Sequence, residues 1–151
     1  MVDVNSSGRV YPPFGPYQVG REKVREFSGA VGATREVHHD LAAAQAAGFS
    51  DLVAPTTFAV IIAQQAEAQL IEDPAAGIDF SRVVHADERF VHNRPLVAGE
   101  EVLTVLTVES IKERAGLAMV STRCDIHALN DAGEAGELIV SVYSTLAVRG
   151  E

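Results

Sequence analysis

Five histidines are the side chains best suited to move protons near neutral pH, and two of them are adjacent. His38 and His39 precede an apolar stretch that reads as a helix, which places them in a loop. Loops often carry functional groups, so either imidazole is a candidate general acid or base. A loop histidine without a chemical role remains the alternative. The other three histidines fall in strand patterns and are expected to be partly buried and hydrogen-bonded: His85, His92 and His127.

No motif indicates a metal, a phosphate or a nucleophile. The His38-His39-Asp40 run lacks a third ligand at matched spacing, and adjacent loop histidines diverge, so we expect no metal site. Cys124 is the only cysteine and lies in a strand pattern, which predicts a buried, inert thiol and excludes a disulfide framework. There is no glycine-rich phosphate loop and no Gly-x-Ser-x-Gly motif, and we expect no cofactor.

A long apolar helix is the element best placed to carry a site. Pro55 can stand in a first turn, and residues 56–71 then run without Gly or Pro until Asp73-Pro74. Apolar side chains cover most of its circumference, which predicts a buried helix. Shorter helices are predicted over 21–31 and over 41–47, the latter capped by Asp40 and ended by Gly48.

Strand patterns dominate the second half of the chain. Period-two alternation predicts strands over 83–91, 102–111, 117–129 and 138–148, with a turn at 130–133. Within 102–111 it places Ile111 on the face opposite to Val108. The first twenty residues are broken by Pro and Gly and are expected to form an extended lead-in without a helix.

Helices followed by strands favour an α+β fold, with a curved antiparallel sheet wrapped around the long helix. The 151 residues fit a single domain, 1–151. The 12 basic and 21 acidic side chains give a net charge of −9, which argues against nucleic-acid binding. No apolar run reaches the roughly 20 residues of a membrane span, and the N-terminus lacks a signal-peptide core, so we expect a cytoplasmic protein.

Three segments together resemble the MaoC-like (R)-specific hydratases and dehydratases. They are Gln-Val-Gly-Arg-Glu-Lys-Val-Arg-Glu-Phe at 18–27, the run from 46 to 58 with Leu-Val-Ala-Pro-Thr-Thr-Phe, and the run from 85 to 100 with Arg-Pro-Leu-Val-Ala-Gly-Glu. The chain is most similar to actinobacterial (3R)-hydroxyacyl-acyl-carrier-protein dehydratase subunits of the HadA/HadC kind. The resemblance implies a hot-dog fold, dimerised as a double hot dog, that acts on acyl thioesters of fatty-acid metabolism.

The hydratase motif of that family, Asp-x-Asn-Pro-x-His, falls on residues 33–38. His38 matches the catalytic histidine, whereas the Asp, Asn and Pro positions hold Ala33, Arg35 and Glu36. The resemblance therefore assigns proton transfer to His38. Glu36 and Asp40 are possible substitutes for the missing carboxylate.

The family's thioester carbonyl is held by a backbone N–H at the start of the central helix, which corresponds here to Thr56. The resemblance adds Pro55, Thr57, Phe58 and Arg94 as substrate-binding residues. The implied ligand is acyl-coenzyme A or acyl-carrier protein. Because carrier and chain are both acidic, docking needs local cations, and the nearest candidates are Arg82, Arg89 and Arg94.

Three interpretations remain open. The first is an active dehydratase or hydratase. The second is a non-catalytic subunit that binds the acyl chain and pairs with a catalytic partner, so that the assembly is a heterodimer and not a homodimer. The third is a thioesterase, for which Glu36 or Glu67 would activate water.

Overall fold

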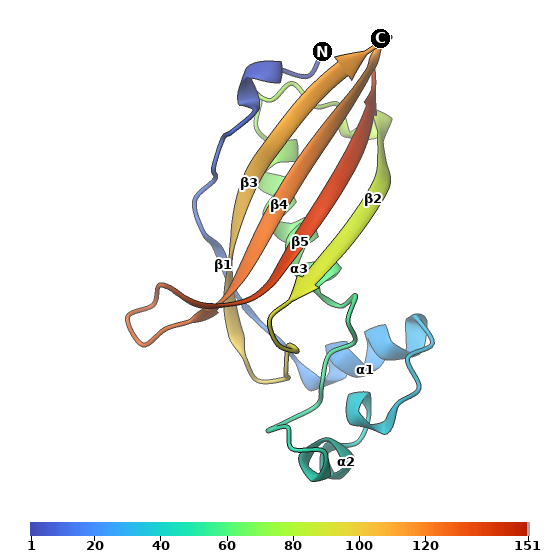
Figure 1. The fold of residues 1–151 in the computed structure, drawn as a ribbon, viewed down its shortest axis with the longest axis vertical. Helices are drawn as coiled ribbons and strands as arrows, with labels where there is room; N and C mark the ends of the chain where they lie inside the picture. Colours follow the sequence, from blue (N-terminus) through green and yellow to red (C-terminus); the bar gives the residue numbers. More distant parts are fainter. Residues whose placement is uncertain (151) are drawn as a thin grey trace.

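A computed structural model describes residues 1–150, and its five strands form one antiparallel sheet (Figure 1). The strand order is β1-β3-β4-β5-β2, so β1 and β2 are the edges. The strands are β1 Phe14–Gln18, β2 Val83–His92, β3 Glu101–Arg114, β4 Leu117–Leu129 and β5 Ala135–Arg149.

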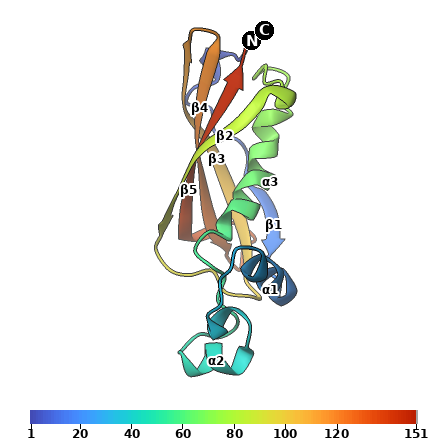
Figure 2. The ribbon, with the colours of Figure 1, turned by 90° about the vertical axis from the view of Figure 1, so that its right-hand side faces the viewer.

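Three helices accompany the sheet: α1 Arg21–Ala30, α2 Leu41–Ala46 and α3 Ala59–Ile71. Helix α3 runs along one side of the sheet, and α1 and α2 lie together beyond one end of it (Figure 2). The two termini lie at the opposite end (Figure 1). Short 3₁₀ turns occur at Val4–Ser6, Glu36–His38 and Phe80–Arg82. The predicted α+β fold, with a curved antiparallel sheet around a helix, is confirmed.

The helix and strand predictions hold to within a few residues, with two exceptions. The lead-in contains a strand, β1, which pairs with β3. Pro16 is tolerated there because β1 is an edge strand with one unpaired side. The lead-in also forms the short turn at Val4–Ser6, which the sequence pattern did not predict.

Helix α3 begins at Ala59 and not at Thr56. The preceding residues form a tighter turn, in which Phe58 N–H donates to Pro55 C=O at 2.9 Å and Val60 N–H donates to Thr57 C=O at 3.1 Å. These are i to i+3 bonds, as in the 3₁₀ geometry that often opens a helix. Thr56 and Thr57 therefore precede the regular helix.

The core lies between α3 and the facing side of the sheet. Helix α3 contributes six buried side chains: Ala59, Ile62, Ala63, Ala66, Glu67 and Leu70. Its other side carries the exposed Gln64 and Gln65, so the helix is covered mainly on the sheet side. The prediction for Ile111 is wrong, because a bulge between Val108 and Ser110 turns Ile111 onto the same face as Val108, and both join the core.

Within residues 1–150, no helix is both long and apolar enough to cross a membrane.

Candidate active site

The loop from Ala33 to Asp40 is held at both ends, which fixes His38 between them. Helix α1 holds one side, because Ala33 N–H donates to Ser28 C=O at 2.8 Å and Arg25 Nε donates to the His39 carbonyl at 2.9 Å. The segment leading to α3 holds the other side, because Val53 N–H donates to Val37 C=O at 2.9 Å.

The His38 ring is fixed through one nitrogen only. Its Nδ1 lies 2.6 Å from the carbonyl oxygen of Val53. A carbonyl can only accept, so Nδ1 carries the proton and a neutral ring keeps a lone pair on Nε2. The side chain is half-buried, and in the described part of the chain Nε2 makes no hydrogen bond. This is the tautomer that a general base requires, since the accepting nitrogen is the open one.

Among the described residues, no carboxylate beside His38 takes the place of the Asp in the family motif. Ala33 has no carboxylate, and its backbone carbonyl accepts from His39 Nε2 at 2.7 Å. Asp40 is the N-cap of α2, as predicted, and its Oδ1 accepts from Ala43 N–H at 2.7 Å. Glu36 is exposed and makes no side-chain hydrogen bond within residues 1–150. His38 and His39 thus each give one ring nitrogen to a backbone carbonyl, but only His38 contacts the segment that leads to α3.

The turn before α3 presents unpaired amides. The N–H groups of Thr56 and Thr57 find no acceptor among the described residues, and both side chains are exposed. Unpaired amides and the helix dipole favour negative charge at such a terminus. Val53, whose carbonyl holds His38, precedes Thr56 by three residues, so the Cα atoms of Val53 and Thr56 are at most about 10 Å apart. The His38 ring therefore contacts the same segment that carries the two unpaired amides.

His92, the last residue of β2, contacts that same turn. Its Nε2 lies 2.8 Å from the Thr56 carbonyl oxygen, while its Nδ1 is buried and unpaired within residues 1–150. The Phe90 ring stacks near it at a centroid distance of 6.3 Å. The sequence prediction of a partly buried, hydrogen-bonded histidine is confirmed, but nothing in the strand pattern pointed to its partner.

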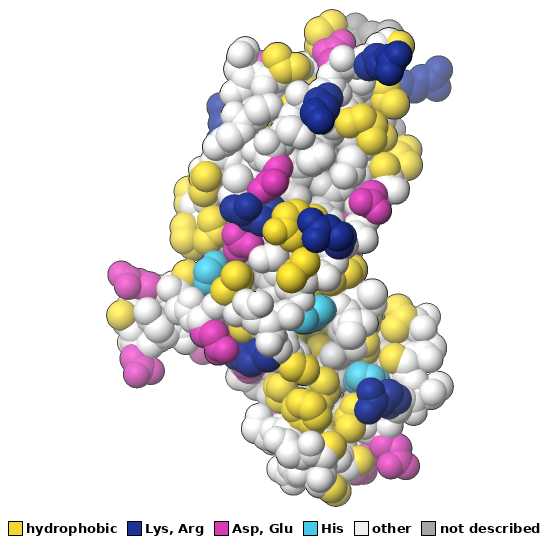
Figure 3. All heavy atoms as spheres, in the orientation of Figure 1, with side chains coloured by type: hydrophobic (Ala, Val, Ile, Leu, Met, Phe, Trp, Pro, Cys, Tyr) yellow, Lys and Arg dark blue, Asp and Glu magenta, His cyan; other side chains and the backbone are white. Residues whose placement is uncertain are grey.

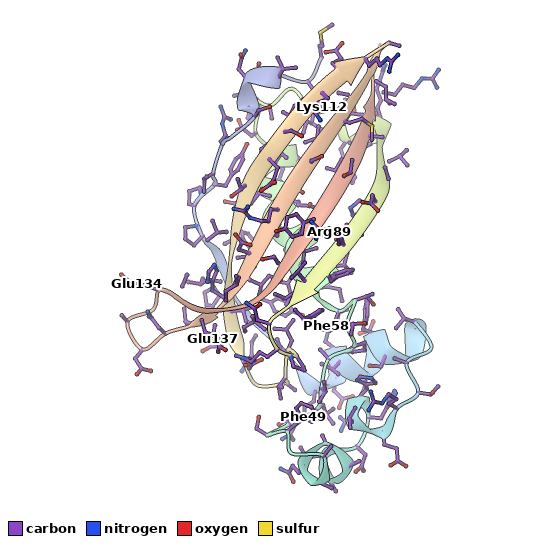
Figure 4. All side chains as sticks on the ribbon, in the orientation of Figure 1. Phe49, Phe58, Arg89, Lys112, Glu134 and Glu137 are labelled. Carbon is purple, nitrogen blue, oxygen red and sulfur yellow. The ribbon has the colours of Figure 1, made fainter. Side chains whose placement is uncertain are left out.

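The remaining predicted substrate-binding residues have varied surroundings. Pro55 is buried, and Phe58 is fully buried against Phe27 with a ring-centroid distance of 5.5 Å. Phe58 lies where the sheet meets the helical end (Figure 4). The Arg94 guanidinium lies 2.7 Å from Glu100 and 3.1 Å from Glu137.

The proposed docking arginines are spread over the molecule. Arg82 donates to the Gly150 carbonyl at 2.8 Å, at the end that holds the termini. Arg89 stacks over Tyr143 with its guanidinium carbon 4.0 Å from the ring centroid, about half-way along the sheet (Figure 4). On that face, basic and acidic side chains are interspersed (Figure 3), so it carries no continuous basic patch.

Neither of two cavities in the chain is lined by His38 or Thr56. One of about 230 Å³ lies near the termini, beside Val2 and Arg82. Another of about 470 Å³ lies beside Leu129 and Glu134, at the β4–β5 hairpin. Within residues 1–150, no three His, Cys, Asp or Glu side chains are arranged to hold a metal ion.

A second polar cluster, which the sequence did not reveal as a unit, lies beneath the middle of α3. Thr122, Ser144 and Glu88 occupy adjacent register positions on β4, β5 and β2. Above them Glu67 of α3, only 4% exposed, accepts a hydrogen bond from Thr122 Oγ1 at 2.7 Å. His85 Nε2 lies 2.8 Å from Glu88 Oε2. We call Glu67, Glu88, Thr122 and Ser144 the buried polar row, and His85 lies exposed beside it.

A β-bulge explains how His85 and Glu88 meet. Residues three apart on a regular strand point to opposite faces. Here the register shifts between His85 and Asp87, so that His85 faces Leu146 and Glu88 faces Ser144, two positions on the same side of β5. The only sign of this cluster in the sequence was Glu67, a glutamate inside an apolar helix.

Burial raises the pKa of Glu88, and the negative charges of Glu67 and Asp87 add to the rise against the opposing effect of His85. Burial also raises the pKa of the Cys124 thiol, whose sulfur lies 3.7 Å from the Ala63 carbonyl oxygen. Cys124 is therefore the buried thiol that the sequence predicted. It stays protonated at neutral pH and is no nucleophile.

Comparisons with known proteins agree on a family. A model of the FAS1-like dehydratase domain region matches residues 6–136. A UPF0336 protein of Leifsonia xyli subsp. xyli is 48% identical over 153 residues, covering 100% of this chain and 99% of its own. The structure of a C-terminally truncated HadBC (3R-hydroxyacyl-ACP dehydratase) complex from Mycobacterium tuberculosis is 32% identical with a TM-score of 0.79, covering 96% and 97% of the two chains. A structure described as a MaoC-like dehydratase is 30% identical with a TM-score of 0.82, covering 96% of this chain and 42% of its own.

Proposed function

The chain belongs to the family of FAS1-like dehydratase regions, and we propose that it interconverts (3R)-hydroxyacyl thioesters and enoyl thioesters of fatty-acid metabolism. Its likeness to MaoC-like dehydratases and its hot-dog fold support a hydro-lyase of this type. The single observation that carries the proposal within this chain is the His38 ring, held through Nδ1 and open at Nε2.

His38 can perform both proton transfers of a syn elimination. Its Nε2 takes the proton from C2 of the hydroxyacyl thioester, and the C2–H electrons form the new double bond to C3. The C3–O bond breaks, and the imidazolium returns its proton to the departing hydroxyl, which leaves as water. Hydration runs through the same steps in reverse. The bond from Nδ1 to Val53 keeps the ring in the required orientation throughout.

Negative charge develops on the thioester oxygen as the C2 proton leaves. We place that oxygen at the turn before α3, where the amide of Thr56 is unpaired and the helix dipole is favourable. Pro55, Thr57 and Phe58 form that turn with Thr56. This arrangement needs neither a metal nor a cofactor.

A second candidate, a non-catalytic subunit, is favoured by the carboxylate that is missing beside His38. Ala33 has no carboxylate and Asp40 is engaged as a helix cap. In that case the chain binds the acyl group and a homologous partner supplies the complete Asp-His pair. The HadBC (3R-hydroxyacyl-ACP dehydratase) structure is itself that of a complex.

Both candidates imply dimerisation through a sheet edge. In the described part of the chain β2 pairs only with β5, which leaves its other edge open, and it exposes Val84 and Val91. An unpaired strand edge is a template for a second strand. The partner is a second copy in the first candidate and a homologous subunit in the second.

The carrier is coenzyme A or an acyl-carrier protein, and both are acidic. Arg94 is the docking candidate nearest in sequence to His92, but Glu100 and Glu137 already neutralise it. Arg89 has no acidic partner among the described residues and stacks on Tyr143. We therefore place carrier docking nearer to Arg89 than to Arg82, which lies by the termini.

The test is hydration of crotonyl-coenzyme A by the purified chain and by His38→Asn. The Asn amide nitrogen can replace Nδ1 in donating to Val53, but it offers no base at the Nε2 position. We expect activity to fall by about a hundredfold or more, as for loss of a general acid–base, with an unchanged melting temperature. Undiminished hydration in His38→Asn contradicts the proposal.

A further inference from the structure

His92 contacts the Thr56–Thr57 peptide, which carries the unpaired Thr57 amide in the turn before α3. A carbonyl can only accept, so the His92 Nε2 that lies 2.8 Å from Thr56 C=O carries the ring proton. The bond joins the end of β2 to a turn 36 residues earlier. It is not part of any helix or strand ladder, so removing it leaves the regular structure intact.

That bond sets the direction of the next amide. A trans peptide is planar, and its C=O and N–H point in opposite directions. Fixing the Thr56 carbonyl therefore fixes the Thr57 N–H, which is unpaired among the described residues. Donation to the carbonyl also polarises the peptide and strengthens its N–H as a donor.

The His92 ring is itself well fixed. It follows Phe90, whose ring lies nearly parallel to it at an interplanar angle of 21°. The next residue, Asn93, donates its N–H to Ile139 C=O at 2.8 Å, which anchors the end of β2 to β5. The His92 side chain thus connects the sheet to the turn in a fixed orientation.

We propose that His92 is a positioning residue, which orients the Thr56–Thr57 peptide so that the Thr57 amide joins Thr56 in holding the thioester oxygen. The inference rests on the proposed function for the identity of the ligand. His92 contacts no substrate atom and acts only through the peptide.

The test uses three variants and two measurements. His92→Ala removes the donor, whereas His92→Gln can restore it, because the Gln amide nitrogen reaches about as far as Nε2. His127→Ala is the matched control, since His127 makes the same kind of bond, from Nδ1 to Gly136 C=O at 3.0 Å, at the β4–β5 hairpin. The measurements are kcat and KM for crotonyl-coenzyme A hydration and the NMR amide shift of Thr57.

We expect His92→Ala to lower kcat by at least about tenfold, toward the roughly hundredfold cost of a misplaced group, with KM little changed. His92→Gln should recover most of the rate, and the Thr57 amide should move in the Ala variant alone. Full activity in His92→Ala, or equal loss in Ala and Gln, overturns the proposal. So does an equal loss in His127→Ala.

Failure of the proposed function can be told apart from failure of this inference. If the wild-type chain does not hydrate the substrate, the role of His92 can still be tested by titration with crotonyl-pantetheine, with the Thr57 amide shift as the readout. The Thr57 amide should then shift on ligand addition in wild type and His92→Gln and stay still in His92→Ala. An equal shift in all three proteins overturns the role of His92, whereas no shift in any of them counts against the proposed function instead.

Discussion

The two polar regions along α3 differ in how deeply their groups are buried. At the start of the helix, His38 and His92 each give one ring nitrogen to a backbone carbonyl, and the amides of Thr56 and Thr57 stay unpaired. Under the middle of the helix, Glu67 is bonded to Thr122 inside the core. The first region holds its groups in place and keeps donors and a base available, which is the requirement for catalysis.

The buried polar row is closed off from solvent. Glu67 is almost completely buried, and the row is closed by α3 above and the sheet below. Glu67 is therefore a poor candidate for activating water in a thioesterase, although its carboxylate lies in the middle of the fold. Changes in the row should alter folding stability, and changes at the start of α3 should alter turnover.

The largest effect is expected from Thr56→Pro, which removes the amide N–H and replaces an exposed side chain. Proline suits this second position of the Pro55–Phe58 turn. Loss of one oxyanion donor should lower kcat/KM by about a hundredfold to a thousandfold, with little change in melting temperature. Thr56→Ala keeps the amide and serves as the control. Equal activity of the two variants would remove Thr56 from the site.

Thr122→Val should lower the stability of the fold and leave turnover unchanged. It leaves the buried Glu67 carboxylate without its hydrogen-bond donor, at a cost of about 1–3 kcal/mol in the free energy of unfolding. Thr145→Val, on the outer side of β5, should change that free energy by less than about 0.5 kcal/mol. Denaturant unfolding measures both. A loss of turnover in folded Thr122→Val would show that the row takes part in the reaction.

Asp40 offers a test of the loop itself. Asp40→Ala removes the cap of α2 and should cost about 1 kcal/mol of stability. Asp40→Asn keeps a capping side chain and should match wild type in both stability and hydration rate. If Asp40→Asn folds normally but loses hydration activity, Asp40 supplies the missing carboxylate after all.

The smallest effect concerns pH. The pKa of Glu88 is raised in the folded state above its ordinary value of 4.5, so the folded chain binds this proton more tightly than the unfolded chain. The resulting stability is present below pH 4.5 and is lost as pH rises toward the raised value.

Glu88→Gln imitates the protonated form, so its free energy of unfolding relative to wild type should be higher at pH 8 than at pH 5. Glu113→Gln, at an exposed position, should show no such trend. An advantage of Glu88→Gln that shrinks with rising pH would contradict the assignment.

The sequence predicted the regular elements well because their signals are local. Asp40 caps α2, and α3 ends at Ile71, just before the predicted stop at Asp73-Pro74. Bulges are not local signals, and they account for the wrong face of Ile111 and for the meeting of His85 with Glu88. The β1 strand was missed because Pro and Gly are acceptable at an edge, which the pattern alone does not reveal.

The candidate site was only partly predictable for the same reason. His38 and Thr56 were identified from family-like segments, and the contact of His38 with Val53, three residues before Thr56, is a structural finding. The contact of His92 with Thr56 spans 36 residues and depends on where β2 ends, so no spacing in the sequence indicates it.

The most direct test of the proposed chemistry is analysis of the product formed from crotonyl-coenzyme A by the purified chain. The proposed site predicts (3R)-hydroxybutyryl-coenzyme A with its thioester intact, and loss of that product in His38→Asn. Release of free coenzyme A thiol, a (3S) product, or no hydrated product from the wild-type chain would contradict it.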